Sequence, residues 1–271
     1  MKHMDYLKVG KFPLFWCRGC GNGVVLGAIV RAFEQLEMTR ENTVVVTGIG
    51  CWGKVDDYVT TNSFHGTHGR ALAFATGIKL ANPALDVVVL MGDGDGATIG
   101  GNHFIHACRR NIDVTAIMVN NYNYGMTGGQ YSGTTPEGAT TTTSRYGHIE
   151  QPFDICELAK AAGAPFVARS AADDPVGLQK LIVEGIKKKS MAFIEVIAPC
   201  PTHFGRNNAL GSPAEMMRAV REKAVTPDRA AKMTGEELAG KIIMGKLCDR
   251  EAEDYGVKYA KIIEKAKEGA K

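Results

Sequence analysis

Two loop segments carry polar residues suited to holding a metal ion against an anion. The sequence Gly-Asp-Gly-Asp-Gly at 92–96 follows an apolar run at 86–91, and a pair of asparagines at 120–121 follows a second run at 114–119. Each run is short, rich in aliphatic residues and bounded by turn residues, which predicts a buried parallel strand. Residues 99–110 between them have a helical pattern, so the two strands form one crossover unit and end side by side.

Asp93 and Asn121 are the oxygen donors that this unit brings together. Glycines let backbone amides approach an anion closely, and carboxylate and amide oxygens are the ligands that Mg²⁺ prefers. A second carboxylate in the loop, Asp95, would repel a bare pyrophosphate unless a cation lay between them. Residues 92–97 also fit a loose dinucleotide fingerprint, so a plain nucleotide-binding loop is the alternative. The residues favour a metal-bridged diphosphate.

Four of the seven cysteines predict a second site. Cys17 and Cys20 precede a helix, whereas Cys51 and Cys200 each follow a predicted strand. Such junctions gather at one edge of a doubly wound sheet, so a site with four thiolates is geometrically plausible. A thioredoxin-like dithiol and a structural zinc site are the alternatives.

The remaining cysteines, Cys108, Cys156 and Cys248, lie within helical patterns. Because apolar residues flank the first two, we expect them to fill the core. Disulfides are not expected in a chain of this kind.

The composition is that of an ordinary globular protein. The chain has 271 residues, of which 45% are hydrophobic and 23% charged, and its formal net charge is +3. This charge gives no reason to expect nucleic-acid binding, and no apolar run reaches the roughly 18 residues of a membrane span. The first residues contain no apolar core of signal-peptide length, so we expect a cytoplasmic protein.

The elements that position these residues alternate along the chain. Helices are predicted at 21–38, 69–81, 99–110, 153–162 and 175–189, and strands at 43–47, 86–91, 114–119, 166–169 and 192–197. Such alternation predicts an α/β fold with a doubly wound, mostly parallel sheet. The Gly- and Thr-rich segment 125–144 is expected to be a loop, either one that covers the diphosphate site or a plain flexible one.

The character of the sequence changes after residue 204, which predicts a main domain at 1–204 and a helical C-terminal extension at 205–271. Within the extension, 214–223 is a short helix and 235–267 has apolar residues at helical spacing. This tail either packs on its own domain or docks on a partner.

Six blocks of sequence carry a family resemblance. The spacing of GDG and NN is that of the thiamine diphosphate motif, and the full set of blocks resembles the β subunits of 2-oxoacid:ferredoxin oxidoreductases over residues 12–208. The four-subunit 2-oxoglutarate (2-ketoglutarate) type is nearest. The blocks, in order, are WCRGCGNG, GIGCWGK, FHGTHGRALAFATGIKLANP, GDGDGATIGGNHFIHACRRN, NNYNYGMTGGQYSGTTP and APCPT.

The resemblance implies three cofactors. Asp93, Asn121 and the backbone carbonyl of Asn123 would hold Mg²⁺ against thiamine diphosphate. The four cysteines Cys17, Cys20, Cys51 and Cys200 would ligate a [4Fe–4S] cluster. The residues implied to contact thiamine diphosphate are Ile49, Gly50, Cys51, Trp52, His68, Gly94, Asp95, Gly125 and Met126.

The implied reaction is oxidative decarboxylation of a 2-oxoacid with coenzyme A and ferredoxin. The glutamate that activates the thiamine ring normally lies in a pyrimidine-binding domain, which 271 residues leave no room for, so an α subunit is the expected partner. Small γ and ferredoxin-like δ subunits can complete the complex. A non-redox thiamine-dependent decarboxylase subunit and a Zn-stabilised structural subunit are the competing interpretations.

One departure from the family's common pattern lies beside Cys51. Trp52 and Lys54 stand where many relatives have small residues, and the indole would shield the cluster or reshape the substrate pocket. Lys54 is either a contact for a substrate carboxylate or an exposed lysine.

Overall fold

A seven-stranded sheet forms the centre of the protein, and the computed structural model describes residues 2–269 of it. The strand order is β2-β1-β3-β4-β6-β5-β9, parallel throughout except for β9, which pairs antiparallel with β5. The strands are β1 (Thr43–Thr47), β2 (Asn62–His65), β3 (Asp86–Gly92), β4 (Thr115–Asn120), β5 (Phe166–Ala171), β6 (Ala192–Ile197) and β9 (Gly245–Asp249). This order and direction confirm the predicted mostly parallel sheet.

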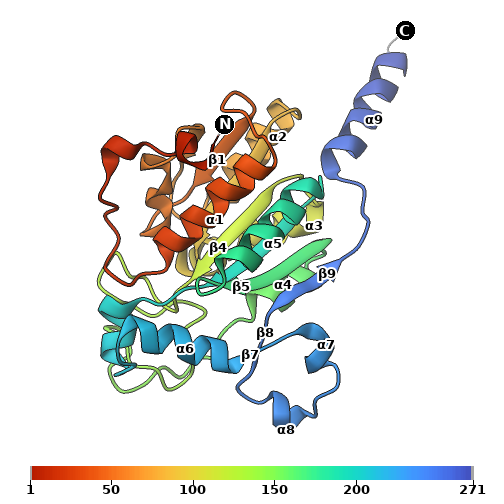
Figure 1. Ribbon diagram of the computed structural model, residues 1–271. Coiled ribbons are helices and arrows are strands. Elements are labelled where there is room, and N and C mark those ends of the chain that lie inside the picture. The colour runs from red at the N-terminus through yellow and green to blue at the C-terminus, as the bar shows by residue number, and fades with distance from the viewer. Residues whose placement is uncertain (1, 270–271) are drawn as a thin grey trace.

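Helices cover both faces of the sheet (Figure 1). One face packs against α1 (Asn22–Gln35) and α5 (Pro175–Lys187), and the other against α2 (Ala71–Ala81), α3 (Gly101–Arg110) and α4 (Ile155–Ala161). Each face of the sheet has its own hydrophobic core, and alternate residues of each strand pack into one or the other. In β3, Val88 and Leu90 pack into the first core, whereas Val89 packs into the second. Burial on both faces explains why the central strands are continuous apolar runs.

Smaller elements complete the chain. They are the 3-10 helices His3–Tyr6, Val9–Lys11 and Trp52–Asp57, the π-helices Gly94–Ile99 and Pro201–Gly205, the helices α6 (Pro213–Lys223), α7 (Pro227–Ala230), α8 (Gly235–Leu238) and α9 (Tyr255–Gly269), and the short parallel pair β7 (Ala224–Val225) and β8 (Ile242–Ile243). Among the helices of residues 2–269, none has the length and apolarity that a bilayer crossing requires.

The helical prediction for 235–267 is wrong over its central part. Residues 242–243 and 245–249 are strands, and β9 closes the edge of the main sheet beside β5. Leu247 and Cys248 pack against the second core, and pairing with β5 satisfies the backbone of an otherwise open edge. The placement of Cys248 in a helix is therefore also corrected. Pairing with β5 therefore decided the structure of this segment, although its apolar residues have helical spacing.

The last helix, α9, does behave as an amphipathic tail. It points away from the sheet (Figure 1), and none of its residues is buried. The side chains of Ile262 and Ile263 are exposed. The tail segment is thus divided between a strand that joins the main sheet and a helix that extends from it.

Candidate functional site

Asp93 follows β3 directly and is held from several sides. Its side chain is 1% exposed, and its Oδ2 accepts hydrogen bonds from Ser132 Oγ at 2.6 Å and Thr134 Oγ1 at 2.7 Å. Its Oδ1 accepts a longer bond, 3.4 Å, from the backbone N–H of Asn121. Burial raises the pKa of this carboxyl, and the two hydroxyl donors oppose that shift. The contact with Asn121 confirms that the ends of β3 and β4 lie side by side.

Asp95 organises the opposite wall. Its Oδ1 accepts from the backbone N–H of Gly69 at 2.7 Å and of Ile49 at 3.2 Å, and it lies 2.6 Å from Nδ1 of His68. This contact fixes the orientation of the imidazole. A Cβ on Gly48 would lie 2.0 Å from Oδ2 of Asp95, so only glycine fits where that loop crosses the carboxylate.

A cavity with an empty volume of about 550 Å³ lies between these two carboxylates. Every residue predicted to contact magnesium or thiamine diphosphate lines it. The lining residues are Ile49, Gly50, Cys51, Trp52, His68, Gly92, Asp93, Gly94, Asp95, Asn121, Asn123, Tyr124, Gly125, Met126 and Thr127. The structure thus brings these residues together around one cavity, and their roles as ligands stay predictions.

The polar groups of this cavity fit a hard cation and an anion. Within the described part of the chain, Oδ2 of Asp95 and both side-chain polar atoms of Asn123 are buried without a hydrogen-bond partner. Buried polar atoms of this kind are costly unless a ligand satisfies them. A Cβ on Gly94 would approach the ring of Tyr124 to 2.4 Å, so the backbone at the cavity is necessarily glycine.

A second cavity, of about 680 Å³ empty volume, adjoins the first and contains the four predicted cysteines. The two cavities share Cys51, Asn121, Gly125 and Met126 as a common wall. The second is lined by Phe15, Trp16, Cys17, Cys20, Cys51, Asn121, Gly125, Met126, Cys200, Pro201, Thr202 and His203. The prediction that these four cysteines lie together is confirmed.

The spacing of the sulfur atoms bears on what they can bind. Burial first, and the neighbouring thiols to a smaller extent, raise the pKa of Cys20 to about 12 and that of Cys51 to about 11. Yet across residues 2–269 no three of these sulfurs lie within 4.8 Å of one another. Tetrahedral zinc, with Zn–S bonds of about 2.3 Å, would need sulfurs about 3.8 Å apart. Thiolates of an iron–sulfur cluster each bind a separate iron, so the donor set fits a cluster better than one zinc ion.

An aromatic group fixes the loops around the cysteines. Trp16 Nε1 donates to the carbonyl oxygen of Cys51 at 2.6 Å, which joins the N-terminal loop to the loop after β1. The indole of Trp16 also packs on Trp52 and Tyr58, with centroid separations of 5.8 and 5.3 Å. Trp52 lines the first cavity and is 2% exposed.

The remaining residues singled out in the sequence, Lys54 and two of the other cysteines, lie outside both cavities. Lys54 pairs with Asp57 at 2.5 Å on the surface, and neither cavity includes it in its lining. Cys108 and Cys156 are fully buried, which confirms the core prediction, although the Cys156 thiol also contacts Glu195.

Three residues that support the carboxylate and the loop were not predicted from the sequence. Ser132 and Thr134 donate to Asp93, and the hydroxyl of Tyr124 donates to the backbone carbonyl of Gly94 at 3.0 Å. Ser132 and Thr134 lie in the Gly- and Thr-rich loop, where their residue types alone carried no distinguishing signal.

Comparisons with known proteins agree with this geometry. The model of the thiamine pyrophosphate enzyme C-terminal TPP binding domain matches residues 48–196. The 2-oxoglutarate synthase subunit KorB of Methanocaldococcus jannaschii is 48% identical over 97% of this chain and 98% of its own length, and that of Methanothermobacter marburgensis is 49% identical over 91% and 87%. The 2-oxoglutarate:ferredoxin oxidoreductase of Magnetococcus marinus, solved with 2-oxoglutarate, coenzyme A and succinyl-CoA, aligns with a TM-score of 0.88 and 32% identity over 98% of this chain and 91% of that one.

The fold and the cavity define a thiamine pyrophosphate-binding domain. Within that class, the chain belongs to the β subunits of the 2-oxoacid:ferredoxin oxidoreductases, nearest those of the 2-oxoglutarate type.

Proposed function

We propose that this chain binds Mg²⁺–thiamine diphosphate in the first cavity and a [4Fe–4S] cluster in the second, and that it acts on 2-oxoglutarate with coenzyme A and ferredoxin. The common wall of the two cavities carries the proposal. Cys51 borders both, so an electron leaving the first cavity would enter the second across a single residue.

Each polar group of the first cavity has a task in this proposal. Asp93 and Asn121, with the carbonyl of Asn123, would hold the metal, and Asp93 is kept in place by Ser132 and Thr134. Asp95 orients His68 through Nδ1, which leaves Nε2 available to the cavity. When bound, thiamine diphosphate supplies the carbon nucleophile and electron sink for decarboxylation, and the cluster accepts single electrons.

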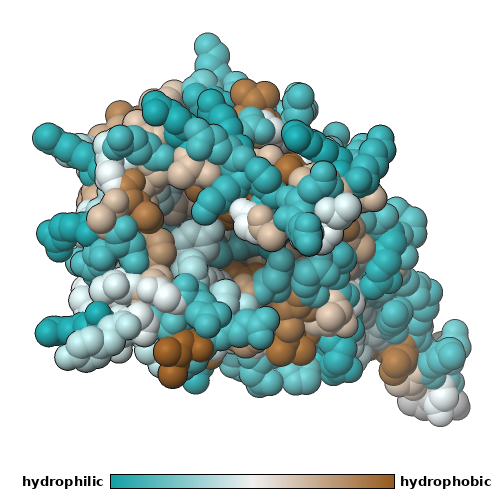
Figure 2. Space-filling model, turned by 90° about the horizontal axis from the view of Figure 1, so that it is seen from below, coloured by the Kyte–Doolittle hydropathy of each residue, from teal (hydrophilic) through white to brown (hydrophobic). Residues whose placement is uncertain are grey.

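The proposal includes a partner subunit that carries the pyrimidine-binding domain and its activating glutamate. Apolar side chains are exposed along residues 126–153, beginning at the cavity wall: Met126, Tyr146, Ile149 and Phe153. Figure 2 shows the face seen from below in Figure 1, with a hollow near its middle and hydrophobic patches among hydrophilic residues. Exposed apolar groups of this kind favour an obligate interface with the α subunit. A ferredoxin-like δ subunit and ferredoxin would then receive the electrons, and a small γ subunit would complete the complex.

The test is copurification of the chain with its α partner under anaerobic conditions, followed by a panel of 2-oxoacids with coenzyme A and a viologen dye. We expect dye reduction with 2-oxoglutarate that requires both subunits. Full turnover by this polypeptide alone, with no second subunit detectable by mass spectrometry, would contradict the need for a partner. Stoichiometric zinc without acid-labile sulfide would contradict the cluster.

A further inference from the structure

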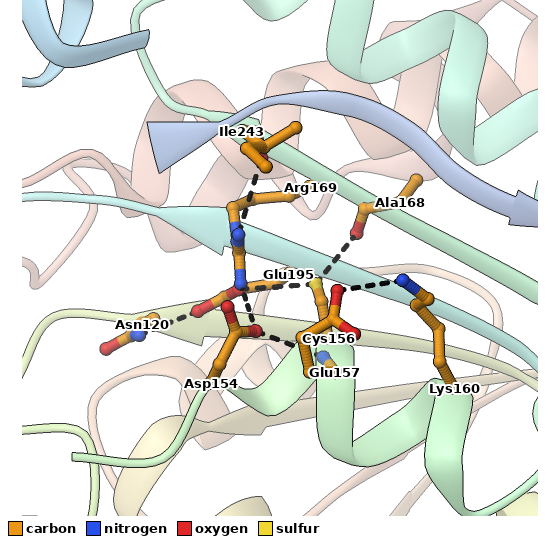
Figure 3. Close-up of polar contacts among 9 residues, drawn as sticks. All are labelled: Asn120, Asp154, Cys156, Glu157, Lys160, Ala168, Arg169, Glu195 and Ile243. Atoms are coloured by element: carbon orange, nitrogen blue, oxygen red, sulfur yellow. Dashed lines mark hydrogen bonds and ion pairs between the residues drawn. The ribbon is translucent and has the colours of Figure 1, made fainter. Parts of the chain in front are cut away.

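A buried polar chain runs from Arg169 of β5 through Glu195 of β6 to Asn120 at the end of β4 (Figure 3). Arg169 Nε donates to Glu195 Oε2 at 2.6 Å, and Glu195 Oε1 accepts from Asn120 Nδ2 at 2.7 Å. Asn120 Oδ1 in turn accepts the backbone N–H of Tyr122 at 3.1 Å. The side chains of Asn120, Arg169 and Glu195 are all at least nine-tenths buried. We propose that Glu195 and Arg169 are positioning residues for the metal-binding turn 120–123.

The turn needs such support because its backbone is unusual. Tyr122 has φ +64°, a left-handed conformation that a bulky residue rarely adopts. The Asn120 side chain stabilises it by bonding the N–H two residues on, and this holds only while its amide oxygen faces Tyr122. Glu195 holds that orientation from the amide nitrogen side, since a carboxylate accepts and cannot donate, and the Thr134 hydroxyl contacts the amide oxygen at 3.0 Å from the other side. Asn121 lies between these two residues, so its placement depends on the amide of Asn120.

A carboxylate at 195 satisfies three donors at once. Its two oxygens accept from Asn120 and from Arg169, and Oε2 also accepts the Cys156 thiol at 3.3 Å. Arg169 is anchored by Asp154 and by the backbone carbonyl of Ile243 in β8. Asp154, Cys156 and Glu195 are close enough to bind a cation, but Arg169 already supplies the positive charge there. The cluster is therefore a support and not a second metal site.

The substitution Glu195→Gln separates this role from simple packing. Glutamine has one accepting oxygen and one donating NH₂ group. In one orientation its NH₂ faces the Arg169 donor, and that hydrogen bond is lost. In the other its NH₂ faces Asn120, whose amide must then reverse and lose its hydrogen bond with the backbone N–H of Tyr122. We expect Mn²⁺ affinity, measured by calorimetry on the complex with saturating thiamine diphosphate, to fall at least tenfold, the usual effect of losing such a partner. The double substitution Glu195→Gln with Arg169→Gln should restore the Mn²⁺ affinity. The amide oxygen at position 169 would then stand where Nε of Arg169 stood, and it would accept a hydrogen bond from the NH₂ group at position 195.

A matched control lies at the other end of the strands, beside their amino-terminal ends. Lys79 and Asp113 form a largely buried pair at 2.6 Å, near the start of β4. Asp113→Asn should lower the unfolding temperature while leaving Mn²⁺ affinity within about twofold, because the pair lies far from the turn. Asn120→Ala removes the amide link but keeps the Glu195–Arg169 pair, and it should lose affinity as Glu195→Gln does.

The inference rests on the proposed function, and Asp93→Asn in the same titration separates the two. If wild type and Asp93→Asn bind Mn²⁺ equally, the proposed metal site is wrong, and the inference falls with it. If Asp93→Asn loses affinity whereas Glu195→Gln or Asn120→Ala keeps it within about twofold, only the positioning role is overturned. If Glu195→Gln does not fold, Asn120→Ala decides between these outcomes.

Discussion

The two halves of the site are held in different ways. Asp93 and Asp95 follow a central strand, and side-chain and backbone donors surround their oxygens. The four cysteines come instead from three loops, joined by the indole of Trp16 at Cys51. The fold therefore preorganises the diphosphate half, whereas under our proposal the bound cluster would itself supply part of the order of the cysteine half.

The largest effect should come from breaking the preorganised half. Asp93→Asn removes the charge that faces the metal but keeps the shape of the side chain. Retention of thiamine diphosphate should fall at least a hundredfold, about 3 kcal/mol, without loss of the fold. The bound cofactor of purified variant and wild type measures this. Unchanged cofactor content would place the metal elsewhere.

Changing the cysteines should affect a different cofactor. Each of Cys17, Cys20, Cys51 and Cys200 changed singly to serine should lower iron and sulfide content while the metal half still binds thiamine diphosphate. Cys108→Ser is the control: it buries a hydroxyl in the core, at a cost of about 1–3 kcal/mol of stability, but should keep the iron. Iron loss in the control, or full iron in all four variants, would contradict the assignment.

A smaller effect is expected from loosening the loops alone. Trp16→Phe keeps most of the aromatic packing but removes the bond to the Cys51 carbonyl, worth about 1 kcal/mol. The cluster should be lost faster on exposure to a chelator, while thiamine diphosphate affinity stays within about twofold. Phe12→Leu, at an exposed aromatic residue that lines neither cavity, is the matched control. Equal loss rates in wild type and Trp16→Phe would mean that the indole does not hold the loop.

The smallest effect is expected at Lys54. Its ammonium pairs with Asp57 at the surface, and such exposed pairs contribute about 0–1 kcal/mol. Lys54→Met should leave the KM for 2-oxoglutarate within about twofold. A tenfold rise in KM without a change in kcat would restore the hypothesis that this lysine contacts the substrate carboxylate.

The sequence predicted the parts of this molecule that local patterns determine. Apolar runs and the residues after them located β3 and β4 and brought Asp93 beside Asn121. The edge strand β2 escaped prediction because all four of its residues are exposed and show no apolar alternation. Strand β9 was taken for helix because pairing with β5, far away in the sequence, decides its structure.

The supporting residues could not be predicted, because their roles exist only in three dimensions. Ser132 and Thr134 reach Asp93 across about 40 positions of sequence, and Glu195 reaches Asn120 across 75. A hydroxyl residue in a loop, or a glutamate in an apolar strand, indicates that a hydrogen-bond partner exists. The residue type does not indicate which residue that partner is. Burial of Glu195 in β6 was the one available signal, since a buried charge requires a partner.

One measurement tests most directly whether the two halves work together. Anaerobic 2-oxoglutarate and coenzyme A are added to the complex, and the visible absorbance of the cluster is followed in wild type and in Asp93→Asn. The account predicts bleaching in wild type and none in Asp93→Asn, although both contain the same iron and sulfide. Equal bleaching in the two proteins, or no cluster absorbance in wild type, would contradict it.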